Sequence, residues 1–459
     1  MKPMKTLSLA LACALLLAGC ALGPDYAKPK LDLPAAYKED GRWKSAQPQD
    51  ALPRGDWWHI YQDPRLDQLM DTLNRQSPGI AQAEAQYRQV QALLKQAEAG
   101  LFPSLGLNAG QSRGVSSPGQ ATSTSYNLSA NASWELDLWG GLRRSVEAGS
   151  AKAQASAAQL AAIRLSAQAQ LATAYLQISV ADLQLRQLQA NEQALAETLK
   201  LTRNQYQAGI VSDANVAQAE SQWQSAQAQR VDKQLTRAQL EHAIAAALGQ
   251  TPASFSLPAA SAEPRLPSIP AGLPSQLLER RPDIAAAERA VAQANAEIGV
   301  AQAAFFPTLT LSASGGYRGA SFADWVSLPN RVWSLGPALA LSLFDAGLRS
   351  AHKEQAIAAY DASVAGYRLT VLSAFQSVED NLAAQRLLGE EAASQQAALD
   401  AARRAETIAL NQYRAGTVSY LNVLSAQSGR ISAETTLWNV KNRQYAGSVA
   451  LIAALGGGW

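Results

Sequence analysis

The stretch SYNLSANASWELDLWG (Ser125–Gly140) alternates apolar and polar residues without a break from Tyr126 to Leu138. The even-numbered positions carry Tyr, Leu, Ala and Trp, and the odd-numbered positions carry Asn, Ser, Glu and Asp. A period of two predicts a β-strand with one apolar and one polar face. Most of the chain is instead rich in Ala, Gln and Leu, which favour helix. The fold must therefore accommodate a long two-faced strand in a largely helical protein.

The chain is a tandem duplication, and each half contains such strands. SPGIAQAEAQ at 77–86 matches RPDIAAAERA at 281–290, and NQYQAGIVSDANV at 204–216 matches NQYRAGTVSYLNV at 411–423. In each half, a helix that ends at a Phe-Pro pair precedes two alternating segments. The predicted strands are residues 104–113, 123–138, 308–318 and 333–344.

A helix of unusual length follows each pair of strands. Residues 142–207 contain no Pro and a single Gly, so they predict a helix of about 100 Å. Leu171, Ile178 and Leu185 recur at intervals of seven, which is coiled-coil spacing. A short glycine turn then reverses the chain into a second helix, which we expect to end near Ala247. The second half predicts the same helical hairpin.

The N-terminus predicts export. Two lysines precede an apolar run over residues 7–18, which is too short to span a membrane, and small residues lead to Cys20. This pattern is typical of a secretory signal peptide. Leu-Ala-Gly-Cys resembles the lipobox of bacterial lipoproteins, which implies that Cys20 is acylated after residues 1–19 are removed. Ala21, rather than Asp, follows the cysteine and points to the outer membrane.

The predicted organisation has five segments. They are a signal peptide (1–19), a lipid-anchored extended segment (20–63), a first structural repeat (64–249), a Pro-rich linker (250–276) and a second structural repeat (277–459).

Composition argues against nucleic-acid binding and against catalysis. Loss of Lys2 and Lys5 with the signal peptide leaves equal numbers of basic and acidic residues, so there is no electrostatic case for nucleic acid. His59, His242 and His352 are far apart in the sequence and lack metal-ligand spacing. No phosphate-binding, dinucleotide-binding or hydrolase motif occurs. We therefore predict that the protein is not an enzyme and that its only attached group is the lipid on Cys20.

The predicted strands are long enough to span a bilayer, which needs about 9–11 residues. A soluble sandwich would give the same local pattern, but the lipoprotein signal and the small number of strands favour a membrane barrel. Four strands cannot form a barrel alone, because their edges would expose unpaired backbone groups to lipid. Two copies would give eight strands around a filled interior, and three copies would give 12 strands around a lumen.

Several motifs carry a family resemblance along essentially the whole mature chain. They are Gly23-Pro24-Asp25-Tyr26, Gly55-Asp56-Trp57-Trp58, Arg280-Arg281-Pro282-Asp283-Ile284 and the C-terminal Ala454-Leu455-Gly456-Gly457-Gly458-Trp459. With the lipobox, they resemble the outer-membrane factors of tripartite efflux pumps, the TolC/OprM-like (NodT) family.

The resemblance implies a mixed α and β membrane protein of the TolC-like fold. Four β-strands per chain would form a trimeric 12-stranded barrel in the outer membrane of a Gram-negative bacterium. A long α-helical coiled-coil tunnel would continue the barrel into the periplasm. The partners implied are a periplasmic adaptor (membrane fusion protein) and an inner-membrane transporter of the resistance-nodulation-division (RND) class. The channel itself would need no cofactor.

The resemblance also places candidate site residues at the tips of the two helical hairpins. The turns with Tyr206, Gly209, Tyr413 and Gly416 would meet the adaptor, although such turns also simply end helices. A periplasmic gate would lie beside them, formed by Asp213, Leu421, Asn422 and Ser425. The family carries acidic side chains where this chain has Asn422 and Ser425. We therefore expect a gate held shut by hydrogen bonds and apolar contact.

Three alternatives stay open on sequence alone. Similar channels serve metal-ion efflux and type I protein secretion, and a lipid-anchored periplasmic coiled-coil scaffold would explain the heptads without the strands. The mature chain keeps a single methionine, Met70, and no free thiol, which argues weakly against a path for soft metals. We expect the inner-membrane partner to select the substrate.

Overall fold

The structure is a computed structural model that describes residues 21–30, 56–115, 121–269 and 280–457. The chain forms two compact units, and each takes segments from both sequence repeats. The strand unit has its described residues within 21–30, 85–158 and 284–370, and the hairpin unit has them within 56–84, 159–283 and 371–457.

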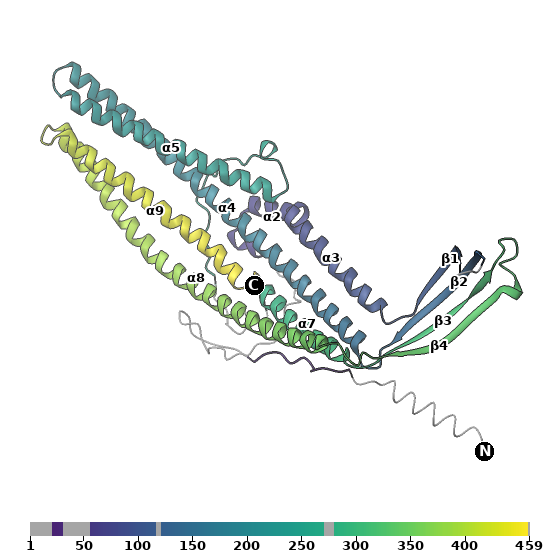
Figure 1. The fold of residues 1–459 in the computed structure, drawn as a ribbon. Helices are drawn as coiled ribbons and strands as arrows, with labels where there is room; N and C mark the ends of the chain where they lie inside the picture. Colours follow the sequence, from purple (N-terminus) through teal and green to yellow (C-terminus); the bar gives the residue numbers. More distant parts are fainter. Residues whose placement is uncertain (1–20, 31–55, 116–120, 270–279, 458–459) are drawn as a thin grey trace. The chain divides into compact units, whose positions relative to one another are not determined.

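The order of elements repeats between the two halves (Figure 1). The first half contains η1 (Trp57–Tyr61), α2 (Pro64–Gln76), α3 (Pro78–Ala99), β1 (Ser104–Gly114), β2 (Ser123–Leu136), α4 (Gly141–Gln207) and α5 (Asp213–Ala247). The second half contains α7 (Pro282–Ala303), β3 (Thr308–Gly319), η3 (Leu328–Asn330), β4 (Arg331–Ala340), α8 (Leu348–Arg414) and α9 (Tyr420–Ala454). A short 3-10 helix, η2 (Pro252–Ser254), lies in the expected linker.

The four predicted strands form one antiparallel sheet in the order β1-β2-β3-β4. Its register sorts the side chains, because directly opposed residues in a ladder point to the same face. One cross-strand row contains Leu105, Ala132, Ala313 and Leu335. The next row contains Gly106, Asn131, Ser314 and Ser334, of which the two serine hydroxyls lie 2.8 Å apart. We name these two sides the apolar face and the polar face.

Two strands end before the expected residues. β2 stops at Leu136 because the Asp137 carboxylate accepts hydrogen bonds from the amides of Leu142 and Arg143 in the first turn of α4. β4 stops at Ala340 rather than Phe344, because its partner β3 begins only at Thr308, after a proline that has no N–H to donate.

The hairpin helices have nearly the predicted bounds. α4 and α8 have 67 residues each, which corresponds to about 100 Å. α5 and α9 have 35 residues each. α5 runs antiparallel to α4, as shown by the ion pairs Arg203–Glu220 at 3.3 Å and Arg237–Asp182 at 2.6 Å. Among the described residues, no helix is both long enough and apolar enough to cross a bilayer.

The main core of the hairpin unit lies around the segment Trp57–Tyr61. This segment was expected to be extended but forms η1, which buries Trp57, Trp58 and Tyr61. Leu66, Met70 and Leu73 of α2 join them, with buried residues of α4, α5 and α9. Burial of the aromatic residues stabilises the turn, since each large side chain contributes roughly 1.5–3 kcal/mol.

The strand unit holds the segment 21–30 by polar contacts that explain the motif Gly23-Pro24-Asp25-Tyr26. Arg144 donates to Asp25 at 3.0 Å, and Asn295 donates to the Pro24 carbonyl at 2.8 Å. The Tyr26 hydroxyl donates to Glu288. The segment is therefore fixed to α4 and α7. The predicted lipid attachment at Cys20 and the signal peptide at 1–19 lie outside the described residues.

Candidate functional site

The tips of the two hairpins are helix-ending turns that need a left-handed glycine. Gly209 has φ +73° and Gly416 has φ +74°. The Gly209 amide donates to the Tyr206 carbonyl at 2.9 Å, and the Gly416 amide donates to the Tyr413 carbonyl at 2.9 Å. The next amide in each turn reaches one residue further back, which is the Schellman pattern. The two repeats thus close their hairpins in the same way.

An apolar cluster lies beneath these turns, and we name it the tip cluster. Its buried members come from three helices and are Leu199, Ala219, Tyr420, Val423 and Leu424. Tyr413 packs against it, with its ring centroid 5.4 Å from that of Tyr420. The Tyr413 hydroxyl donates to Gln205 of α4 at 2.7 Å. The tip cluster therefore joins the ends of the two hairpins.

The first turns of α9 separate buried residues from the predicted gate residues. Tyr420, Val423 and Leu424 face the tip cluster, whereas Leu421, Asn422 and Ser425 are exposed. Spacings of three and four place these exposed residues on one side of the helix. Leu421 leaves 51% of its surface accessible in the single chain.

The other predicted gate residue starts the first hairpin. Asp213 is exposed and is the first residue of α5, where a carboxylate interacts favourably with the helix dipole. It does not share the α9 face that carries Leu421. Tyr206 is also exposed, and Tyr413 is half-buried because it packs on the tip cluster.

A known protein family matches the segments of the sequence that form the sheet and the two hairpins. A model of the outer membrane efflux protein family matches residues 69–250 and 273–457. The chain belongs to this outer membrane efflux protein family. The expected localisation in the Gram-negative outer membrane and the expected efflux function are thereby confirmed.

Individual relatives support the same assignment over nearly full length. This efflux protein is 34% identical to a Pseudomonas putida protein named pyoverdine export outer membrane protein OpmQ, over 91% of each chain. It is 31% identical to the toluene efflux pump outer membrane protein TtgC of Pseudomonas putida, over 99% of this chain and 95% of the relative. The solved structure of the outer-membrane channel OprN superposes with a TM-score of 0.86 at 31% identity, covering 96% of this chain and all of that one. The expected TolC-like fold is confirmed.

A buried polar cluster in the efflux protein links its two hairpins, and the sequence analysis missed it. The Arg430 guanidinium contacts Glu406 at 2.6 Å, Glu434 at 2.8 Å and the Asn191 amide oxygen at 2.8 Å. Arg403 also contacts Glu434, at 2.8 Å. The Glu434 side chain is only 8% exposed, so its charge depends on these two arginines. The one sequence signal was the i,i+4 spacing of Arg430 and Glu434 on α9.

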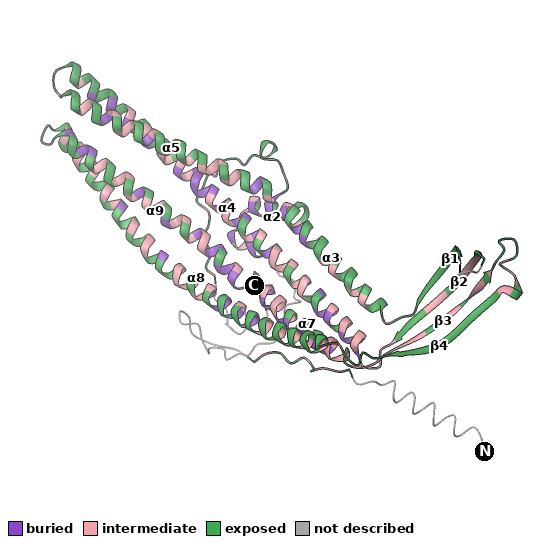
Figure 2. Ribbon diagram, viewed as in Figure 1, coloured by how far each residue is buried: buried purple, intermediate pink, exposed green. Residues whose placement is uncertain are grey.

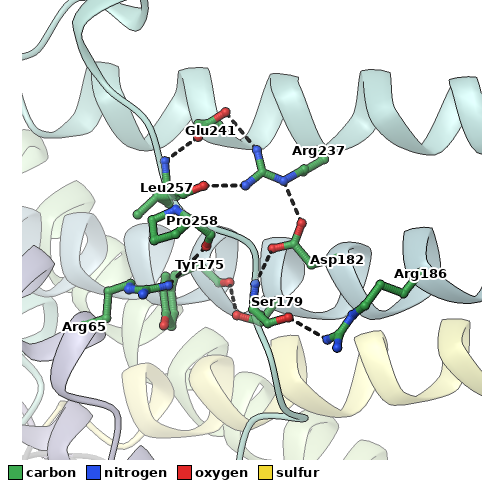
Figure 3. A network of polar contacts seen from close by, with 10 residues as sticks. Arg65, Tyr175, Ser179, Asp182, Arg186, Arg237, Glu241, Leu257 and Pro258 are labelled. Atoms are coloured by element: carbon green, nitrogen blue, oxygen red, sulfur yellow. Dashed lines mark hydrogen bonds and ion pairs between the residues drawn. The ribbon is translucent and has the colours of Figure 1, made fainter.

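A second polar network fixes the Pro-rich segment 255–265, which we name the strap (Figure 3). Arg237 of α5 donates to the Leu257 carbonyl at 2.7 Å and to Asp182 of α4 at 2.6 Å. Asp182 also accepts from the Ala260 amide at 2.9 Å. Glu241 accepts from the Leu257 amide, and Arg65 donates to the Pro258 carbonyl. The strap therefore satisfies its backbone groups with charged side chains from α2, α4 and α5.

Three buried tyrosines surround the strap and the main core. The Tyr61 hydroxyl lies 2.7 Å from Ser448, Tyr175 donates to Asp63 at 2.7 Å, and Tyr445 donates to the Pro264 carbonyl at 2.6 Å. Burial raises the pKa of each of these phenols above its ordinary value. All three phenols therefore stay neutral at physiological pH.

The three histidines lie on three different elements. His59 contacts Asp67 at 2.7 Å, which is an exposed surface pair, and His242 and His352 lie on α5 and α8. Within the described ranges, no group of three or more His, Cys, Asp or Glu could hold a metal ion.

Proposed function

We propose that three copies of the chain close a 12-stranded barrel and form a passive outer-membrane duct. The observation that carries this proposal is the sheet itself. In one chain, β1 pairs only with β2 and β4 pairs only with β3 within the described sheet, so both outer edges are open. Figure 2 shows these two edge strands exposed along their length.

In a lipid bilayer, the open edges of the sheet must be paired. Unpaired N–H and C=O groups cost several kcal/mol each in a bilayer, so the edge of β4 needs the edge of β1 from another copy. Along β2 the apolar face runs from Trp134 to Tyr126, which is about 27 Å along the strand and somewhat less along the membrane normal. Outer-membrane barrels carry an apolar band of about 25 Å flanked by aromatic residues, so this face suits contact with lipid.

Three copies suit a conducting pore better than two. An eight-stranded barrel fills its interior with side chains, whereas larger barrels enclose a lumen. The polar face, with Asn131, Ser133 and Ser314, would line that lumen with small neutral groups. Such a wall favours passage of many compounds over tight recognition of one.

The duct would take its cargo from an inner-membrane RND transporter through a periplasmic adaptor. The exposed turns at Tyr206–Gly209 and Tyr413–Gly416 are the surfaces that we assign to the adaptor, since they protrude beyond the tip cluster. The duct would perform no catalysis and need no cofactor, because the inner-membrane partner supplies the energy. Acylation of Cys20 would anchor each chain to the outer membrane.

Small organic compounds are the cargo that the comparisons favour. The two relatives described above are named for pyoverdine export and for toluene efflux. Metal-ion efflux gains no support from the single methionine of the mature chain, because Met70 is fully buried in the main core. A lipid-anchored scaffold would not explain the sorted faces of the sheet, and type I secretion would use the same duct with another partner.

Leu421, Asn422 and Ser425 would narrow the periplasmic end of the pore, with Asp213 as a nearby charge. Replacing Leu421 and Asn422 together by Ala should raise the single-channel conductance in planar bilayers, because it removes apolar and hydrogen-bonding contacts at the narrowest point. Leu201→Ala is the matched control, since Leu201 on α4 is also a leucine with 51% exposure. Equal conductance in the double variant and the control would contradict this placement of the gate.

A further inference from the structure

The apolar face of the sheet carries two charged residues at one end. This face consists of the odd-numbered residues of β1, β3 and β4 and the even-numbered residues of β2. Among them, only Arg113 and Arg331 are charged. Arg113 pairs with Thr124 and Arg331 pairs with Tyr317, so both arginines lie at the end where loops connect β1 to β2 and β3 to β4.

Neither arginine has an acidic partner in the described part of the chain. Both are exposed, and the described ion pairs include neither. The five residues 116–120 between β1 and β2 are Ser, Ser, Pro, Gly and Gln, which add no acid. The sequence between β3 and β4 contains one acid, Asp324, and the described ion pairs do not include it. Two uncompensated cations thus stand on a face that is otherwise apolar or neutral.

The β3–β4 loop folds back over the same end and adds aromatic rings to it. The ring centroid of Phe322 lies 5.5 Å from that of Tyr126, and the centroid of Trp325 lies 6.0 Å from it. A side chain at Gly319 would meet Trp325 at 3.0 Å, so the loop sits directly on the sheet. Phe322 nevertheless keeps 69% of its surface exposed, and Trp333 of β4 keeps 73%.

We propose that this end of the apolar face binds the phosphorylated glycolipid of the outer leaflet, with Arg113 and Arg331 contacting its phosphate groups. The exposed aromatic rings would pack against the sugar and the upper acyl chains, as amphipathic rings do at membrane interfaces. Guanidinium groups match phosphate oxygens in a bidentate manner. These loops lie at the ends of the strands opposite to those where α3, α4, α7 and α8 join, so in the proposed duct the facing leaflet is the outer one.

Energetics explain why arginine is tolerated here. A cation on the lipid face is costly at the bilayer centre but costs little near the interface. The two arginines are the residues of their strands nearest to the loops on this face. Each basic side chain near an anionic surface contributes about 1 kcal/mol of attraction, which corresponds to about a fivefold change in affinity.

The inference rests on the lipid-facing placement proposed above. It is tested by comparing arginine variants on the apolar face with an arginine variant on the polar face. Purified full-length oligomer in zwitterionic detergent would be titrated with bisphosphorylated lipid A, and bound lipid would be counted by native mass spectrometry. The test variants are Arg113→Gln, Arg331→Gln and the double variant. Arg318→Gln is the control, because Arg318 is an exposed arginine at the same end of the sheet but on the polar face. Bilayer conductance would verify that each variant still forms a channel.

The expected result is about fivefold weaker binding for each single variant and about 30-fold for the double variant. Arg318→Gln should leave the affinity unchanged. The same acylated disaccharide without phosphates should bind weakly to every variant, and inorganic phosphate should not displace the lipid. Double replacement by Lys should retain most of the binding, because the charges remain.

Two other results would overturn the inference. Unchanged binding in the double variant would show that the arginines do not hold the lipid, and displacement by inorganic phosphate would assign the site to a free anion. Failure of the lipid-facing placement itself is recognised separately, with spin labels at Leu335 and Ser334. If the label at Ser334 is accessible to lipid-soluble oxygen and the label at Leu335 is not, the faces are reversed and the proposed duct fails with them.

Discussion

At the scale of single residues, one glycine sets how closely two strands approach. Gly316 on the polar face lies opposite Ser129, and a Cβ there would overlap the Leu128 carbonyl oxygen and lie 2.7 Å from the Ser129 Cα. The adjacent Gly315 has open space where its Cβ would be. The two glycines look alike in the sequence, and only the β2–β3 contact distinguishes them.

This difference predicts unequal effects of alanine at neighbouring positions. Gly316→Ala should destabilise the folded protein by about 1–3 kcal/mol, because backbone atoms of β2 must move. Gly315→Ala should change stability by less than about 0.5 kcal/mol. Urea titration followed by the heat-modifiable migration of the folded oligomer on gels measures both. Equal loss in the two variants would contradict the close approach of β2 and β3.

The buried phenols of Tyr61, Tyr175 and Tyr445 predict alkaline sensitivity. Their pKa values are raised in the folded chain, so above about pH 10 the unfolded chain loses protons that the folded chain retains. The contribution of these phenols to the free energy of unfolding is therefore fully present below about pH 10. Above this pH the free energy of unfolding falls by about 1.4 kcal/mol per pH unit for each tyrosine. Denaturation at pH 9–11, with phenolate absorbance as the probe, measures the slope. Tyr61→Phe should remove one tyrosine's share, and an unchanged slope would count against burial of this phenol.

At the scale of elements, the strap turns an irregular segment into part of the hairpin unit. Asp182 is 3% exposed and serves both Arg237 and the Ala260 amide, whereas Arg186 reaches the Ala260 and Ser261 carbonyls from an exposed position. Loss of a buried polar partner costs more free energy of folding than loss of an exposed one.

The strap should therefore respond differently to two substitutions. Asp182→Ala should destabilise the protein by about 1–3 kcal/mol, because it leaves the Ala260 amide without its acceptor and leaves Glu241 as the only carboxylate that contacts Arg237 among the described residues. Arg186→Ala should cost less than about 1 kcal/mol. Limited proteolysis within residues 255–265, alongside thermal unfolding, distinguishes them. Cleavage of both variants at the wild-type rate would contradict the role of Asp182 in holding the strap.

The elements themselves were largely predictable, and the polar networks were not. Periodicity located all four strands and both long helices, because alternation and heptads are local patterns. Strand ends shifted where Asp137 was recruited to α4 and where Pro307 shortened the ladder to β4. The contacts of Arg430 with Asn191 and of Arg237 with Leu257 join residues far apart in the sequence, so no local pattern indicated them. For the same reason the burial of Tyr420 beside exposed Leu421 needed the structure.

At the scale of the whole molecule, the proposed duct depends on closure of the sheet by copies of the same chain. Within its described residues, a single chain supplies a sorted four-stranded sheet with two open edges and a pair of hairpins joined at their tips. The family match identifies an outer membrane efflux protein but leaves the number of copies and the partners to be measured. The proposed pore, gate and glycolipid contact all require that the sheets of several copies close one barrel.

The most direct test is the mass of the native particle purified from outer membranes, taken together with its conductance in a planar bilayer. We expect a particle of three acylated chains with a pore that is mostly closed and opens occasionally. A monomer or a dimer without conductance would contradict barrel closure by three sheets, and the lipid-anchored coiled-coil scaffold would then become the better explanation.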